Sequence, residues 1–213
     1  MKISRTVLLI TAAAVTATAV ATGVAAANAA PSAAPVAGKA PAAAVHIQDN
    51  GNGLNGPLGD VIGTGVRTHA GLELVIFGAS GITIGQENSY GFALGERLPD
   101  GDVTEWCSIN EDSDVAKNTA PGFHATQEAV AMENDDAMPA FGYYVGTPAK
   151  ITAEYQNKTV TAKTAVWSYD KSVTVFWFDL ADVPADSTLG RPHAYDAAGT
   201  ELPAGNNKVH GII

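Results

Sequence analysis

The chain has only one cysteine, Cys107, among its 213 residues. An intramolecular disulfide is therefore impossible, which excludes the class of small secreted scaffolds that depend on cross-links. Glu105, Glu111 and Asp112 lie close in sequence, and carboxylates disfavour the thiolate that a cysteine nucleophile needs. We therefore predict that Cys107 is a small buried residue, with a disulfide between two chains as the alternative.

Basic residues are scarce: the chain has 12 lysines and arginines but 22 aspartates and glutamates. So acidic a chain repels phosphate backbones and anionic lipid headgroups, which excludes nucleic acid and membrane surfaces as expected partners. After residue 29 there is also no apolar run near the ~20 residues that a membrane-spanning helix needs.

Catalytic motifs are missing as well. The segment Gly78-Ala79-Ser80-Gly81 resembles part of a nucleophile elbow, but Ile82 stands where that motif needs glycine, so a triad of Ser80 with His124 is not predicted. No two histidines have the short spacing of a zinc motif, and we expect them on the surface or in loops, with a zinc site assembled through space as the alternative. The five are His46, His69, His124, His193 and His210.

The first 29 residues have the features of a secretory signal peptide. Lys2 and Arg5 give a positive start, residues 7–20 carry no charge, and Ala27-Asn28-Ala29 supplies the small residues of a cleavage site. Removing residues 1–29 leaves 10 basic against 22 acidic residues, a net charge of −12. The predicted localisation is therefore secreted and extracellular.

A linker and a folded region are predicted to follow. Residues 30–44 consist of Ala, Pro and small residues, a composition typical of a disordered linker. Residues 45–213 are expected to form one β-sandwich domain, with two halves, 45–136 and 137–213, as the alternative.

Hydrophobic residues alternate with period two, which predicts strands and not helices. Residues 150–156, 159–167 and 172–180 are predicted as three consecutive antiparallel strands, separated by turns at Asn157-Lys158 and at residues 169–171. Val173–Leu180 is apolar on both faces, which is typical of a central strand.

Other short strands are predicted at 61–62, 72–77, 82–84 and 90–94, and a hairpin at 195–202 with Gly199 at a positive φ. Residues 123–132 fit either a strand or one short helix. Short strands separated by glycines at intervals of about 8–12 residues indicate an all-β fold, an antiparallel β-sandwich.

Part of the chain resembles a known group of proteins. Phe141-Gly-Tyr-Tyr-Val-Gly, the predicted strands that follow, and Tyr195-Asp-Ala-Ala-Gly-Thr-Glu-Leu resemble the immunoglobulin-like C-terminal parts of secreted proteins of high-GC Gram-positive bacteria. The resemblance covers residues 141–203 and implies a structural fold with no catalytic residues. The two sheet-bridging cysteines of antibody domains are absent.

Acidic residues are concentrated between Asp100 and Asp136, a segment with ten carboxylates and a single basic residue, Lys117. Their oxygens are ligands of the kind that calcium prefers, and extracellular sites of this ion can be weak. The calcium candidates are Asp112, Asp114, Asp135 and Asp136. A solvated loop that keeps the protein soluble is the preferred interpretation, because the spacing matches no known calcium loop, and no other cofactor is predicted.

Aromatic residues concentrate in the C-terminal half. We predict Trp177 in the core, whereas Trp167 and Tyr169, beside a turn, are the candidates for exposed stacking surfaces. Together these features predict a secreted, non-enzymatic protein that binds an extracellular protein or glycan. The alternative is a secreted hydrolase, which metal ions would assist if the histidines converged.

The signal peptide makes a direct prediction. Protein recovered from culture medium is expected to begin at Ala30 or Pro31, because signal peptidase cuts after the small residues that end the signal. N-terminal sequencing of the secreted protein checks this. Recovery of the full-length chain only from cells would contradict it.

Overall fold

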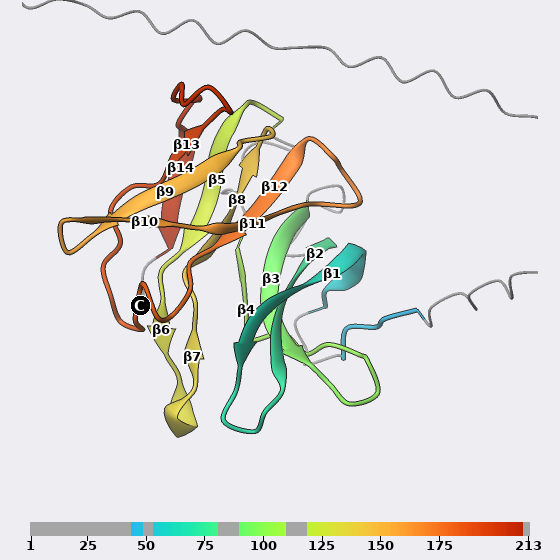
Figure 1. Ribbon diagram of the computed structural model, residues 1–213. Helices are drawn as coiled ribbons and strands as arrows, with labels where there is room; N and C mark the ends of the chain where they lie inside the picture. Colours follow the sequence, from blue (N-terminus) through green and yellow to red (C-terminus); the bar gives the residue numbers. More distant parts are fainter. Residues whose placement is uncertain (1–43, 49–52, 81–89, 110–118, 211–213) are drawn as a thin grey trace, which may run out of the picture. The chain divides into compact units, whose positions relative to one another are not determined.

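The computed structural model describes residues 44–48, 53–80, 90–109 and 119–210, and the predicted signal peptide, most of the predicted linker and the predicted strand 82–84 lie outside them. The described residues form strands and one short 3-10 helix (Figure 1). The elements are β1 (Asn55–Arg67), β2 (Glu73–Ser80), β3 (Tyr90–Arg97), β4 (Cys107–Ile109), β5 (Gly122–Gln127), β6 (Val130–Ala131), η1 (Glu133–Asp135), β7 (Ala137–Met138), β8 (Phe141–Val145), β9 (Lys150–Tyr155), β10 (Lys158–Thr161), β11 (Lys163–Val166), β12 (Val173–Trp177), β13 (His193–Tyr195) and β14 (Gly205–His210). Within this part of the chain no helix has the length and apolar character to cross a membrane.

The strands form a β-sandwich, which confirms the predicted fold class. One sheet has the order β1-β2-β3-β4, a second has the order β11-β12-β8-β5-β14, and a third has the order β10-β9-β13. Strands β6 and β7 pair as a separate hairpin, which Figure 1 shows projecting away from the sheets. Among the strands that the structure describes, every pair is antiparallel except β14 with β5. Because β5 pairs with β8, the five-stranded sheet contains strands from both sides of residue 136.

The five-stranded sheet is covered by apolar residues on both faces. One cluster joins Val175 and Trp177 of this sheet to Leu74 and Phe92 of the four-stranded sheet. The other joins Phe176 to residues of β9 in the three-stranded sheet, including Ile151. Every residue of β12 is buried, as predicted for a central strand.

Two indole N–H groups tie strand β1 to the neighbouring sheet. Trp167 Nε1 donates to Leu58 O at 2.9 Å, and Trp177 Nε1 donates to Thr64 O at 3.1 Å. Both carbonyls lie at or within the register shifts that interrupt the pairing of β1 with β2. The indoles therefore reach β1 where its ladder is irregular and a side-chain donor has room to bind.

The predicted strand 159–167 is wrong as a single element. It divides at Ala162 into β10, which pairs with β9, and β11, which pairs with β12 in the other sheet. The set of side chains that faces the core changes at Ala162, because a shift of one residue moves the side chains of a strand to the opposite face. Val166 is consequently 52% exposed and Trp167 is fully buried, so the prediction that Trp167 is exposed is also wrong.

The turn between β9 and β10 is formed by Gln156 and Asn157, which lie in the left-handed region, so it was predicted one residue too late. Other local predictions are confirmed. Gly199 has φ +82° in the 195–202 hairpin, and Tyr169 is 64% exposed. The ambiguous segment 123–132 contains strands β5 and β6 and no helix.

Trp177 provides a test of this core. Trp177→Ala is expected to lower the free energy of unfolding by about 3–5 kcal/mol, because it removes a buried indole and leaves a cavity. Chemical denaturation followed by circular dichroism measures the change. Tyr169→Ala removes a largely exposed ring that packs on Trp167 and is the control, with a smaller expected change of about 1 kcal/mol. Equal losses in the two variants would contradict the position of Trp177 in the core.

Candidate functional site

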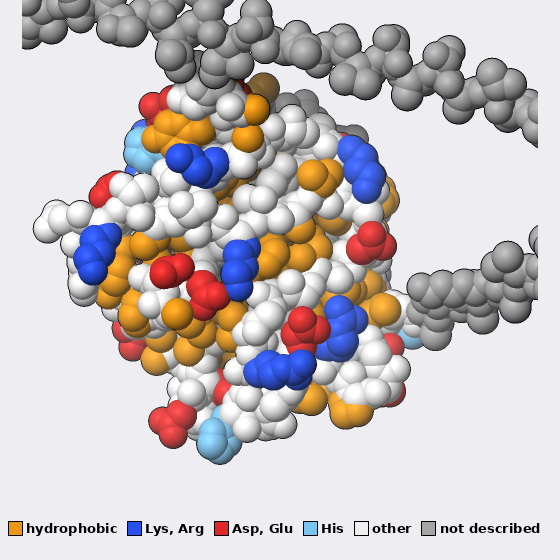
Figure 2. Space-filling model, in the orientation of Figure 1, with side chains coloured by type: hydrophobic (Ala, Val, Ile, Leu, Met, Phe, Trp, Pro, Cys, Tyr) orange, Lys and Arg blue, Asp and Glu red, His pale blue; other side chains and the backbone are white. Residues whose placement is uncertain are grey.

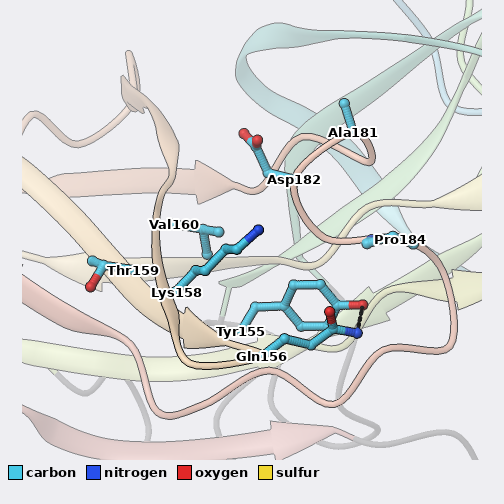
Figure 3. Close-up of a pocket in the computed structure, with 8 residues that line it drawn as sticks. All are labelled: Tyr155, Gln156, Lys158, Thr159, Val160, Ala181, Asp182 and Pro184. Atoms are coloured by element: carbon cyan, nitrogen blue, oxygen red, sulfur yellow. Dashed lines mark hydrogen bonds between the residues drawn. The ribbon is translucent and has the colours of Figure 1, made fainter.

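A pocket of about 550 Å³ lies between the β9–β10 hairpin and the segment 181–184 (Figure 3). Its volume is within the range of sites that hold small molecules. The lining residues provide an aromatic ring, an amide, a hydroxyl, an ammonium and a carboxylate, together with three small apolar side chains. They are Tyr155, Gln156, Lys158, Thr159, Val160, Ala181, Asp182 and Pro184.

The hairpin wall follows from a two-residue turn. Gln156 and Asn157 have φ values of +49° and +61°, which is the geometry that matches the twist of an antiparallel hairpin. In the resulting register Lys158 lies opposite Tyr155, so the two side chains share one face of the hairpin. Val160 follows on the same face, and all three line the pocket.

The opposite wall is held by Asp179. Its Oδ1 accepts a hydrogen bond from Ala181 N, and its backbone O accepts from Asp182 N and Val183 N. Val183 is fully buried and anchors the segment in the core. The hydrogen bond from Lys163 Nζ at 2.8 Å, followed by that from Ala181 N, lowers the pKa of the Asp179 carboxyl. Asp179 therefore stays ionised and keeps this wall attached to β11.

The ring of Tyr155 is fixed in the wall. Its hydroxyl accepts hydrogen bonds from Gln156 Nε2 at 2.9 Å and from Ser187 Oγ at 3.1 Å. The half-buried ring also packs at the edge of the apolar cluster that contains Ile151. A ligand that enters the pocket meets a side chain whose orientation is already set, which lowers the entropy cost of binding.

Two ionised groups of the pocket are available to a ligand. Lys158 and Asp182 are exposed, and neither side chain forms an ion pair or hydrogen bond with another described residue. In Figure 3 Lys158 extends over the pocket toward the segment that carries Asp182. Acidic and basic side chains are interspersed on the face shown in Figure 2, so no field of one sign covers it.

The predicted calcium candidates are only partly described. Asp112 and Asp114 lie outside the described residues. Asp135 and Asp136 lie at the tip of the β6–β7 hairpin, where Asp136 Oδ1 accepts a hydrogen bond from His69 N. Within the described ranges, no three His, Cys, Asp or Glu side chains gather as metal ligands would. Calcium binding by these residues therefore stays an untested alternative to the solvated loop.

Another carboxylate lies close to this hairpin. Burial raises the pKa of Glu96, the negative charge of Asp136 raises it further, and a hydrogen bond with the Trp106 side chain acts in the opposite direction.

The residues of the hydrolase alternative occupy separate structural positions. Ser80 ends β2, and its Oγ lies 3.5 Å from the carbonyl of Asn55. His124 lies in β5, where its ring stacks on Tyr143 and its Nε2 is 2.8 Å from Ala120 O. This histidine is 1% exposed, so its predicted surface or loop position is wrong.

The other described histidines lie on separate parts of the fold. His46 and His69 are exposed, the Nδ1 atom of His193 lies 2.6 Å from Glu201 Oε1, and His210 is the last residue of β14.

Cys107, predicted as a small buried residue, is partly buried against the core, and its Sγ lies 3.1 Å from Met138 Sδ. Burial raises its pKa to about 12, although a backbone hydrogen bond with Leu94 acts in the opposite direction. The thiolate is therefore almost absent at neutral pH.

The pocket residues were not predicted from the sequence. The alternation of apolar and polar residues in the sequence already places Tyr155 and Val160 on one face of the hairpin. The basic residue Lys158 beside them also indicated a polar site on that face. The carboxylate of Asp182 could not be added, because only the tertiary fold brings residues 181–184 to this hairpin.

Calcium provides a test of the acidic segment. Thermal melts in millimolar calcium chloride and in sodium chloride of equal ionic strength are expected to coincide, because a solvated acidic loop responds only to general screening. A higher melting temperature in calcium, lost in the double variant Asp112→Asn, Asp114→Asn, would contradict this expectation and establish a site.

Comparison with known proteins adds no assignment for the pocket. No protein-family model, curated protein or solved structure matches the chain. The resemblance of residues 141–203 to immunoglobulin-like parts of secreted proteins thus stays a prediction. The candidate site rests on the side chains that form it.

Proposed function

We propose that this chain is a secreted, non-enzymatic β-sandwich protein that binds a small polar ligand in the β9–β10 pocket. The observation that carries the proposal is the pairing of a fixed aromatic ring, Tyr155, with two ionised side chains that have no described partner, Lys158 and Asp182. Pockets with apolar area and a few polar groups are the usual form of a small-molecule site.

The surroundings of the pocket support binding rather than catalysis. Catalytic acids and bases usually lie buried or beside a like charge. Lys158 and Asp182 are exposed, and Thr159 Oγ1 already donates to Glu154 Oε1 at 2.6 Å. The pocket therefore offers groups that hold a ligand by charge and hydrogen bonds.

The secretory features of residues 1–29 support an extracellular setting for this binding. The secreted hydrolase remains the second candidate from the sequence, but the described Ser80 and His124 side chains lend it no specific support.

Nuclear magnetic resonance titration tests the proposal. Mixtures of saccharides, amino acids and nucleosides are added to the labelled protein, and at least one compound is expected to shift resonances of the pocket residues. Lys158→Ala with Asp182→Ala is expected to weaken that binding at least about tenfold, because both free ionised groups are removed. Tyr169→Ala, outside the pocket, is the control and should leave the affinity unchanged.

The same samples distinguish binding from catalysis. A bound compound is expected to be recovered unchanged after long incubation. Shifts confined to other surfaces, or turnover of the compound into products, would overturn the proposal.

A further inference from the structure

The ring of Tyr155 indicates the shape of the ligand. Two hydrogen bonds hold its hydroxyl, from Gln156 and from Ser187, so the ring is a fixed apolar surface in a pocket that is otherwise largely polar. A flat apolar ring among hydrogen-bonding groups fits a molecule that is apolar on its face and polar around its edge. A sugar ring has this form, with C–H groups on its face and hydroxyl groups around it.

The polar groups around Tyr155 fit hydroxyl groups. The bond from Gln156 Nε2 to Tyr155 leaves the amide Oε1 as an acceptor, the Asp182 carboxylate is a second acceptor, and the Lys158 ammonium is a donor. A hydroxyl group both donates and accepts, so adjacent hydroxyls of one sugar can use all three side chains.

Charge disfavours the anionic members of this class. Lys158 and Asp182 cancel, so the pocket itself has no net charge. The chain without residues 1–29 has a net charge of −12, which repels anionic sugars at long range. An uncharged ligand does not meet this repulsion.

We infer that the pocket binds a neutral saccharide, with one ring on Tyr155 and its hydroxyls on Gln156, Lys158 and Asp182. The volume of about 550 Å³ accommodates more than one sugar ring, so the end or an internal unit of a short glycan chain fits as well as a single sugar. This inference rests on the proposed binding function and adds the class of ligand.

Isothermal titration calorimetry with maltose, cellobiose, mannobiose and N,N′-diacetylchitobiose tests the inference, with free lysine and glutamate as ionic comparators. At least one disaccharide is expected to bind, with an affinity that stays the same in about 0.5 M sodium chloride, because an uncharged ligand is insensitive to screening. Tyr155→Ala is expected to weaken binding at least about tenfold. Tyr155→Phe keeps the ring and should retain affinity within about threefold.

Two controls keep the test decisive. Tyr169→Ala makes the same change at an exposed tyrosine outside the pocket and should not alter binding. Lys158→Ala and Asp182→Ala change exposed side chains, so they report on the pocket even where Tyr155→Ala lowers the stability of the fold. Each is expected to weaken saccharide binding about threefold or more.

The two proposals fail differently. Salt-sensitive binding of lysine or glutamate, with no heat from any disaccharide, would overturn the saccharide inference and leave the binding function in place. Saccharide binding that is equally strong in Tyr155→Ala, Lys158→Ala and Asp182→Ala would overturn the assignment to this pocket. No binding of either class in calorimetry and no pocket shifts in the resonance titration would overturn both.

Discussion

The hydrogen bonds from two indole N–H groups to strand β1 are the contacts on which the sandwich depends. Trp167 and Trp177 belong to the segment around β11 and β12, yet they donate to Leu58 O and Thr64 O on the other sheet. A buried carbonyl without a donor would cost about 1–3 kcal/mol. The same two rings also fill the apolar cluster between the sheets. One pair of side chains thus supplies both apolar packing and the donors that β1 needs where its ladder shifts register.

The position of Trp167 also explains a glycine that resembled part of a catalytic motif. A Cβ at Gly78 would overlap the indole ring of Trp167, so the residue before Ala79 and Ser80 has to be small. Gly59, at φ +72°, likewise lies against Ser168 and the Trp167 ring. These glycines allow the sheets to approach each other, and a turn for an exposed nucleophile is not needed to explain them.

The fold class, the central strand and most turns were predictable, because alternation and turn residues are local properties of the sequence. Trp177 was correctly assigned to the core from its place in an apolar run. Trp167 was not, because its burial depends on the crossing at Ala162 that reverses which side chains face inward. The pocket could not be predicted for a similar reason, since one wall is a local hairpin and the other arrives from residues 181–184.

The two pocket walls are stabilised by different means, so they respond differently to acid. The hairpin wall depends on apolar packing of Tyr155, and this contact does not change with pH. The other wall depends on the ionised Asp179, whose pKa is lowered first by the hydrogen bond from Lys163 and then by that from Ala181. A carboxyl whose pKa is lower in the folded state adds stability that is fully present above the unfolded pKa. That stability decreases as the pH falls below the unfolded pKa and is lost as it passes through the folded pKa. The arrangement therefore preserves the pocket through mild acidification, and stronger acid weakens the Asp182 wall before the Tyr155 wall.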